Sequence, residues 1–304
     1  MRRIFSTILF LLVLSPVFIS FASAGDINDG KHDFSNIRGA FITVDTECRK
    51  DDSPELQRRD VFGKLNGKEY GIGNIIAILD KNQMKGVFFV DFSMYYFAEP
   101  LLRETLAYIS KAGHDVQLHL HWDNIPPSIR KNRKQVISDA AKYFQSITNK
   151  RILAYRGGSY EIDNDIADAL VENGILYEFS YLRGRDTCKF YTEDIGNSIT
   201  DYKGFIAVPV TTWPDKSLYK MDVNFSDSGT IKAGISALKT PVIFLHSMSF
   251  LKPWDPVSKQ TRLSEVDQKA LTTFIDVIEF INYKKIKSLT VSDLSAEISP
   301  MTHK

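Results

Sequence analysis

The chain has 304 residues, of which 43% are hydrophobic and 25% charged, and its formal net charge is +1. This is an ordinary globular composition, and the length allows one large domain or two smaller ones. Neither the net charge nor the charge distribution indicates nucleic-acid binding. Nucleic-acid-binding proteins usually cluster basic residues, whereas here the basic residues are scattered. We therefore expect a globular protein with no nucleic-acid partner.

The first 24 residues have the pattern of a secretory signal peptide. Arg2 and Arg3 precede an apolar run over 4–21, and the run 22–24 (Ala-Ser-Ala) supplies the small residues of a cleavage site. An uncleaved membrane anchor is the alternative, since the apolar run approaches spanning length. We expect cleavage after Ala24, an exported protein that is periplasmic or secreted, and no stable membrane anchor afterwards.

A polar segment over 25–37 is expected to be flexible, and residues 38–304 read as a single domain of alternating strands and helices. The predicted strands are 39–45, 86–92, 115–121, 152–155, 175–180, 205–210, 241–246 and 288–292. The predicted helices are 73–83, 98–112, 133–146, 162–173 and 264–283. Strand after helix after strand predicts an α/β fold with a parallel sheet of seven or eight βα units. We expect a closed or nearly closed barrel, with a doubly wound open sheet as the alternative.

The segment 113–123, GHDVQLHLHWD, alternates apolar and polar residues as a β-strand does. Residues two apart on a strand point the same way, so His119 and His121 can converge on one ion. His114 precedes the strand, and we expect it to have a structural, hydrogen-bonding role. The two cysteines, Cys48 and Cys188, are compatible with one disulfide or with two free thiols.

Further ionisable residues follow other predicted strands, at the carboxyl ends where parallel βα folds place their sites. Asp45 and Glu47 follow the first strand, Arg156 the fourth, and His246 ends the seventh. Singly, each has an ordinary interpretation, such as a solvated acid or a structural histidine. Together with the histidine pair they favour a metal hydrolase, in which Arg156 can bind a carboxylate and the two glycines after it leave room for a ligand or another backbone.

The order of these motifs resembles the polysaccharide deacetylase family, the NodB-homology carbohydrate esterases. The matching stretches are TVDTE, GVFFVDF, GHDVQLHLH, YRGGSY and VIFLHSMSF, and together they cover most of the predicted mature chain. The sequence looks similar to the branch with a D-x-E acidic motif. The resemblance implies a NodB-like, distorted (β/α)7-8 barrel and metal-dependent removal of acetyl groups from N-acetylated sugars.

The resemblance also implies roles for individual residues. Asp45 matches the catalytic base, Glu47 the metal-binding acid and His119 the first metal-binding histidine. Arg156 matches the residue that orients the base, and His246 matches the general acid. The implied cofactor is a divalent metal, for which zinc is the first choice, and the implied partner is a polysaccharide or cell-envelope glycan substrate.

The second metal-binding histidine departs from the family pattern. H-x-x-x-H would place it at position 123, where this chain has Asp123. We expect His121 to be the second ligand, because it shares a strand face with His119, and Asp123 is the alternative. Trp122, Tyr160 and Trp213 are candidates for stacking on sugar rings, or else core residues.

The predicted function is therefore metal-dependent hydrolysis of N-acetyl or O-acetyl groups on a polysaccharide. One alternative keeps the fold and metal but acts on non-sugar C–N bonds, as an amidase. The other is a non-catalytic exported glycan-binding protein of the same fold.

Overall fold

The computed structural model describes residues 32–213, 216–252 and 263–298. The expected signal peptide, 1–24, lies outside the described residues, as does the first part of the 25–37 segment. The described part of that segment contacts the domain at particular points: the His32 ring lies 2.6 Å from the Asp201 carboxylate and Ile37 is buried, whereas Asp33, Ser35 and Asn36 are exposed. The packed domain therefore begins before the predicted boundary at 38. No helix in the described ranges is long and apolar enough to cross a membrane.

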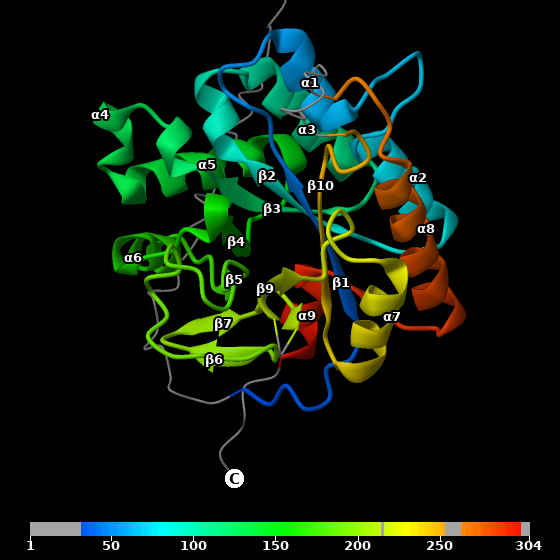
Figure 1. Cartoon of the computed structure of the whole chain (residues 1–304). Coiled ribbons are helices and arrows are strands. Elements are labelled where there is room, and N and C mark those ends of the chain that lie inside the picture. Colours follow the sequence, from blue (N-terminus) through cyan, green and yellow to red (C-terminus); the bar gives the residue numbers. More distant parts are fainter. Residues whose placement is uncertain (1–31, 214–215, 253–262, 299–304) are drawn as a thin grey trace, which may run out of the picture. The chain divides into compact units, whose positions relative to one another are not determined.

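A curled, mostly parallel sheet forms the centre of the domain (Figure 1). Its strands are β1 (Ala40–Thr46), β2 (Val87–Asp91), β3 (Asp115–Leu120), β4 (Ala154–Gly157), β5 (Tyr177–Glu178), β6 (Thr200–Tyr202), β7 (Phe205–Ala207), β10 (Val242–His246) and β11 (Ser288–Leu289). Their order is β10-β1-β2-β3-β4-β5-β7-β6, with β11 beside β1. Each predicted strand is present, although several are shorter than expected. The antiparallel β6 and the hairpin of β8 (Thr212–Trp213) and β9 (Lys216–Lys220) were not predicted.

Irregular chain joins the two ends of the sheet. Met221 donates its N–H to Thr211 O at 3.1 Å and accepts the N–H of Phe244 at 2.8 Å. Single hydrogen bonds, in place of a strand ladder, thus connect the two ends of the curled sheet. The result is a distorted barrel. The predicted fold class is confirmed, and the open doubly wound sheet is excluded.

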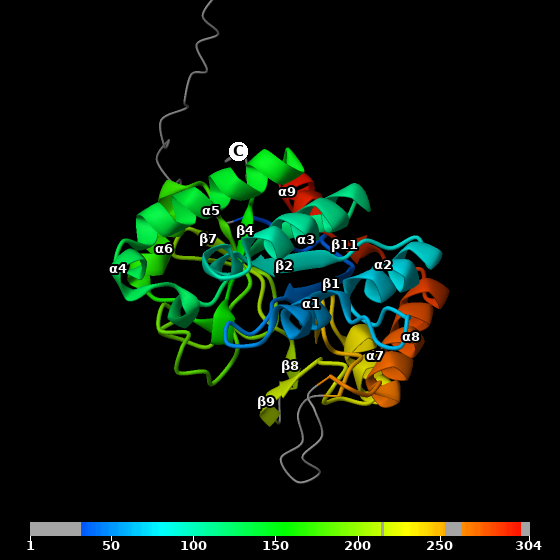
Figure 2. The same ribbon diagram turned by 90° about the horizontal axis from the view of Figure 1, so that it is seen from above.

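Most of the helices lie around the outside of the sheet (Figure 2). The last helix differs, because its Val291 and Leu294 pack into the apolar cluster on the inner side of the sheet. The helices are α1 (Pro54–Phe62), α2 (Ile72–Lys81), α3 (Glu99–Lys111), α4 (Pro127–Arg130), α5 (Arg133–Thr148), α6 (Asn164–Glu172), α7 (Ser228–Ala237), α8 (Gln268–Tyr283) and α9 (Val291–Glu297), with 3-10 turns η1 (Phe92–Tyr96), η2 (Trp122–Asn124) and η3 (Gly158–Tyr160). The five predicted helices are confirmed. Among the helices that were not predicted, α7 contains two glycines, which lower helix propensity. Its N-cap residue, Asp227, is nevertheless of a type that indicates a helix start in a sequence.

Both faces of the central strands are buried. On β1, Ile42 and Val44 belong to the large apolar cluster that includes the helices, while Phe41 belongs to a smaller cluster inside the barrel. The polar face of β3 points to the same interior as Phe41, with Gln117 1% and His119 2% exposed. The alternation predicted for this strand is therefore correct, and its polar side chains find their partners within the protein.

Candidate metal centre

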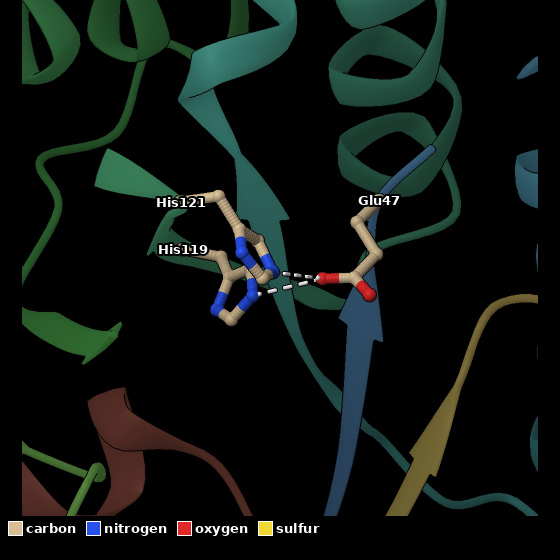
Figure 3. Close-up of side chains that lie close together, drawn as sticks. All are labelled: Glu47, His119 and His121. Atoms are coloured by element: carbon tan, nitrogen blue, oxygen red, sulfur yellow. Dashed lines mark hydrogen bonds and ion pairs between the residues drawn. The ribbon is translucent and has the colours of Figure 1, made fainter. Parts of the chain in front are cut away.

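Three side chains with metal-binding atoms converge at the carboxyl ends of β1 and β3 (Figure 3). Glu47 Oε2 lies 3.0 Å from His119 Nε2 and 2.8 Å from His121 Nε2. One ligand atom from each residue lies within 4.8 Å of the other two. His121 directly follows the last residue of β3 in extended conformation, so the two-residue spacing brings both imidazoles to one side.

The backbone of the next strand orients His119. Its Nδ1 lies 2.8 Å from the carbonyl oxygen of Arg156, its register partner on β4. A carbonyl oxygen only accepts, so Nδ1 carries the proton and Nε2 is the atom presented to Glu47. Such a hydrogen bond is the usual means by which a protein fixes the tautomer of a metal-binding histidine.

The three side chains also determine one another's charge. Burial alone would lower the pKa of His121, but the carboxylates of Glu47, Asp123 and Asp91 together outweigh burial and raise that pKa to about 12. Burial likewise opposes ionisation of Glu47, yet the two imidazoles hold its pKa well below the usual range. In the cluster, the negative charge of Glu47 is thus balanced by the protonated imidazoles. A metal cation can take the place of the imidazole protons.

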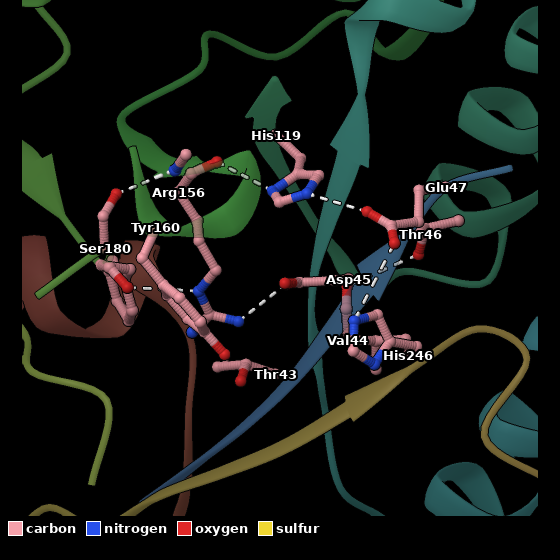
Figure 4. Close-up of polar contacts among 12 residues, drawn as sticks. Thr43, Val44, Asp45, Thr46, Glu47, His119, Arg156, Tyr160, Ser180 and His246 are labelled. Carbon is pink, nitrogen blue, oxygen red and sulfur yellow. Dashed lines mark hydrogen bonds and ion pairs between the residues drawn. The ribbon is translucent and has the colours of Figure 1, made fainter. Parts of the chain in front are cut away.

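A buried ion pair lies beside the cluster (Figure 4). Arg156 Nη1 donates to Asp45 Oδ1 at 2.8 Å, and Arg156 Nε donates to Phe179 O at 3.2 Å. Burial would raise the pKa of Asp45, but the Arg156 guanidinium, with His119 and His246, brings it below its ordinary value. Arg156 therefore holds Asp45 ionised through its side chain and orients His119 through its carbonyl group.

His246 lies at the end of β10, in register with Asp45. Its side chain is 31% exposed, and its Nε2 lies 3.9 Å from Glu47 Oε1. Its backbone N–H donates to Ser249 Oγ at 2.8 Å, which fixes the chain at this point. A partly exposed imidazole at this position can exchange a proton with a molecule bound beside the cluster.

The two candidates for the second histidine position lie in different surroundings. His121 points at Glu47, whereas the Asp123 side chain is 81% exposed and lies 3.7 Å from His121 Nδ1, on the side of the ring away from the Glu47 contact. Asp123 belongs to η2, which turns the chain out of the strand direction. His121 is thus the candidate whose ligand atom lies in the cluster, and its binding of a metal stays a prediction.

The two glycines after Arg156 make room for other parts of the chain. A Cβ added to Gly157 would lie 2.0 Å from the carbonyl oxygen of Glu161. One added to Gly158 would lie 2.5 Å from the His121 ring. The expected space is therefore present, and a backbone carbonyl and a candidate ligand occupy it.

The donor set fits a divalent metal ion. Two imidazole nitrogens and one carboxylate oxygen are a ligand set of catalytic zinc sites, which keep a further position for water or substrate. A ligand can reach these three side chains, because Glu47 and His121 line a cavity of about 730 Å³. The geometry thus provides the ligands, the oriented tautomer and an entry path.

The aromatic residues expected to stack on sugars lie in packed positions. Trp122 is 3% exposed, and its Nε1 donates to the Tyr155 hydroxyl at 3.1 Å. Tyr160 is 7% exposed, and its hydroxyl accepts a hydrogen bond from Lys220 Nζ at 2.6 Å. Trp213 packs against the large apolar cluster. The stacking prediction is therefore corrected for Trp122 and Tyr160, because such buried rings offer no free face to a ligand.

Sequence reasoning missed two residues near the cluster. Phe225 lines the same cavity as Glu47, His121 and His246, and it is 71% exposed. No strand or helix periodicity marks it in the sequence. Asp91 ends β2 fully buried, and burial raises its pKa, with the nearby imidazoles acting in the opposite direction. The rule that singled out Asp45, an acid at the carboxyl end of a strand, would have found Asp91.

Two other expectations concern structural residues. His114 Nδ1 accepts the N–H of Gly86 at 3.1 Å, and burial lowers the pKa of His114 to about 4, which confirms its structural role. Cys48 and Cys188 are both buried free thiols. Of the two possibilities for the cysteines, the structure has the free thiols.

Comparison with known proteins supports the fold. No protein-family pattern matches the sequence, and no curated protein sequence matches it. A putative polysaccharide deacetylase from Mycobacterium smegmatis has the same fold, with a TM-score of 0.54 at 13% identity over 90% of this chain and 97% of that one. A family 4 carbohydrate esterase from Streptomyces lividans in complex with acetate aligns with a TM-score of 0.45 at 12% identity, over 86% and 97%. A CE4-family pseudoenzyme from Bacillus anthracis aligns with a TM-score of 0.49 at 8% identity, over 86% and 67%. At these identities the likeness establishes the fold alone.

Proposed function

We propose that the protein is a metal-dependent hydrolase that removes acetyl groups from an N-acetylated or O-acetylated polysaccharide. One observation carries the proposal: the cluster of Glu47, His119 and His121 lies beside the Asp45–Arg156 pair. The fold shared with the Mycobacterium smegmatis protein supports the reaction class. The motif resemblance of the sequence supports the roles given to the residues.

Glu47, His119 and His121 would hold the metal ion, and zinc suits their mixed nitrogen and oxygen donors. When bound, the ion supplies a Lewis acid that polarises a carbonyl and lowers the pKa of water. Asp45 accepts the proton of the attacking water, a general-base contribution of about 10²- to 10⁴-fold. Arg156 keeps Asp45 charged and in place.

His246 completes the reaction as general acid. Its partly exposed imidazole faces the cavity and donates a proton to the leaving nitrogen, or to the leaving oxygen of an O-acetyl group. The exposed ring of Phe225 on the same cavity supplies an apolar face for a sugar ring. The pattern of residues 1–24 supports export, which would bring the protein to cell-envelope glycans.

The proposal is tested by acetate release from a panel of N- and O-acetylated glycans, with linear amides and ureides as the comparison. We expect acetate from at least one glycan with the zinc-loaded protein and none after chelation. Hydrolysis confined to linear amides or ureides would favour the amidase. Glycan binding by a metal-free protein, without turnover, would favour the non-catalytic glycan-binding protein.

A further inference from the structure

We propose that Asp91 is a positioning residue that aims His121 at the metal centre. This inference rests on the proposed metal site, because it assigns Asp91 the task of holding one of its ligands. The carboxylate lies at the end of β2, in register with His119 on β3. Its Oδ1 accepts the backbone N–H of His121 at 3.2 Å.

The need for this contact follows from the end of the β2–β3 ladder. In this parallel ladder every second residue of β3 donates its N–H to β2, and each step advances both strands by two residues. The series begins with Asp115, which donates to Gly86 O. Continued past the end of the strand, it would bring the N–H of His121 to Phe92 O. Phe92 instead begins the turn η1, which takes its carbonyl out of the ladder. The Asp91 side chain supplies the missing acceptor, and His121 keeps the extended conformation that directs its ring to Glu47.

Asp91 is itself firmly held. It is fully buried, its Oδ1 also accepts the N–H of Ser93 at 2.9 Å, and its Oδ2 accepts the Ser93 hydroxyl at 2.6 Å. Among the described residues, the positive groups that attract it are the imidazoles of His121 and His119, and no Lys or Arg is paired with it. A buried carboxylate without such a partner is costly, so its few hydrogen bonds define its position closely.

The other side of His121 is fixed by packing. Its ring lies against Gly158, where an added Cβ would approach within 2.5 Å. The N–H of the preceding residue, Gly157, donates to Ser180 Oγ at 2.8 Å, which fixes the chain at that glycine. His121 is therefore held at its backbone by Asp91, at its ring face by Gly158 and at Nε2 by Glu47. These contacts allow a histidine beyond the strand end to complete an H-x-H pair.

The test compares zinc affinity and thermal unfolding of full-length variants that have been stripped of metal. We expect Asp91→Ala to weaken zinc binding about 10- to 100-fold, as loss of a ligand-orienting contact does. Asp91→Asn should keep most of the affinity, because its amide oxygen can still accept the His121 N–H. Ser93→Ala, which removes only the hydroxyl partner, should leave the affinity within about twofold.

The matched control is Asp115→Ala, at the opposite end of β3. Asp115 is also buried and also accepts a distant backbone N–H, from Val291 at 2.8 Å. It should lose stability without losing zinc affinity. If Asp91→Ala does not fold, Asp91→Ser gives the same comparison, since its hydroxyl can still cap η1 but ends one bond short of His121.

Equal zinc affinity in folded Asp91→Ala and wild type would overturn the inference and leave the proposed function standing. An equal loss in Asp115→Ala would also overturn it, because the effect would then be general destabilisation. A wild type that binds no zinc would instead contradict the proposed metal site itself.

Discussion

The two ends of β3 carry similar polar residues inside the barrel, but these residues have different partners. At the beginning of the strand, Asp115 accepts the N–H of Val291. Gln117 Oε1 accepts the N–H groups of residues 153 and 154 at 2.9 and 2.8 Å, and its Nε2 donates to Asp115. These polar atoms bind mainly backbone, so they connect strands and stabilise the fold.

At the other end of the strand, the imidazoles of His119 and His121 direct their Nε2 atoms at one carboxylate, that of Glu47. Side chains at a cavity can exchange such partners for a ligand, whereas a backbone N–H buried in the barrel cannot. On one face of β3, the polar residues at the beginning of the strand therefore stabilise the fold, and those at its end form the candidate site. Variants at the two ends should accordingly change different quantities.

The largest expected effect is on turnover. Asp45→Asn keeps the shape of the side chain but removes the base that Arg156 holds ionised. We expect kcat to fall by about 10³-fold or more while zinc binding is retained. Acetate release and zinc content measured on the same sample check this. Asp123→Asn, at an exposed carboxylate, is the control and should stay active, and undiminished turnover in Asp45→Asn would remove Asp45 from the mechanism.

Gln117→Leu should act on stability alone. It leaves two buried backbone N–H groups without their acceptor, so we expect the free energy of unfolding to fall by about 2–4 kcal/mol. Urea denaturation measures this loss, and Gln145→Leu on the exposed face of α5 is the control. A loss of zinc affinity in folded Gln117→Leu would contradict the separation of the two ends.

Gly158→Ala should act on the metal centre. The added methyl group meets the His121 ring, so we expect zinc affinity to fall about 10- to 100-fold, as it does when the orientation of a ligand is lost. Isothermal titration calorimetry checks this result. Gly229→Ala, at a helical glycine whose added methyl meets only the Asp227 side chain, is the control. Unchanged affinity in Gly158→Ala would mean that packing does not fix the ring.

The smallest effect is expected at the cavity rim. Phe225→Ala removes an exposed ring that lines the cavity, so KM for a glycan should rise about threefold to tenfold, or about 1 kcal/mol, with kcat little changed. Tyr283→Ala, at an exposed aromatic residue outside the cavity lining, should leave KM unchanged. Equal KM values for the Phe225 variant and wild type would exclude stacking at this position.

Much of the fold was predictable because it depends on local patterns. The apolar runs of β1, β2 and β10, the apolar–polar alternation of β3 and the helical spacing of α3 and α8 are visible in the sequence. The positions of Asp45, His119 and His246 follow from one rule, that residues at the carboxyl ends of parallel strands meet at one rim. The contact between Glu47 and the two histidines agrees with that rule.

The remaining features depend on contacts between distant segments. The partners of Gln117 lie 36 and 37 residues away, and that of Asp115 lies 176 residues away. Whether an aromatic ring is buried, as for Trp122, or exposed, as for Phe225, depends on the packing of helices and loops around it. The sequence carries no local signal for the distant partners or for the exposure of Phe225, and for Trp122 it offers only an apolar position in the alternation of 113–123.

Zinc titration of the metal-stripped protein tests the central claim most directly, in wild type, His121→Ala and Asp123→Ala. The account predicts one zinc ion per chain in wild type and in Asp123→Ala, because the Asp123 carboxylate lies in solvent. It predicts the loss of this site in His121→Ala, because one of three converging ligand atoms is removed. Zinc binding retained in His121→Ala and lost in Asp123→Ala would contradict the account.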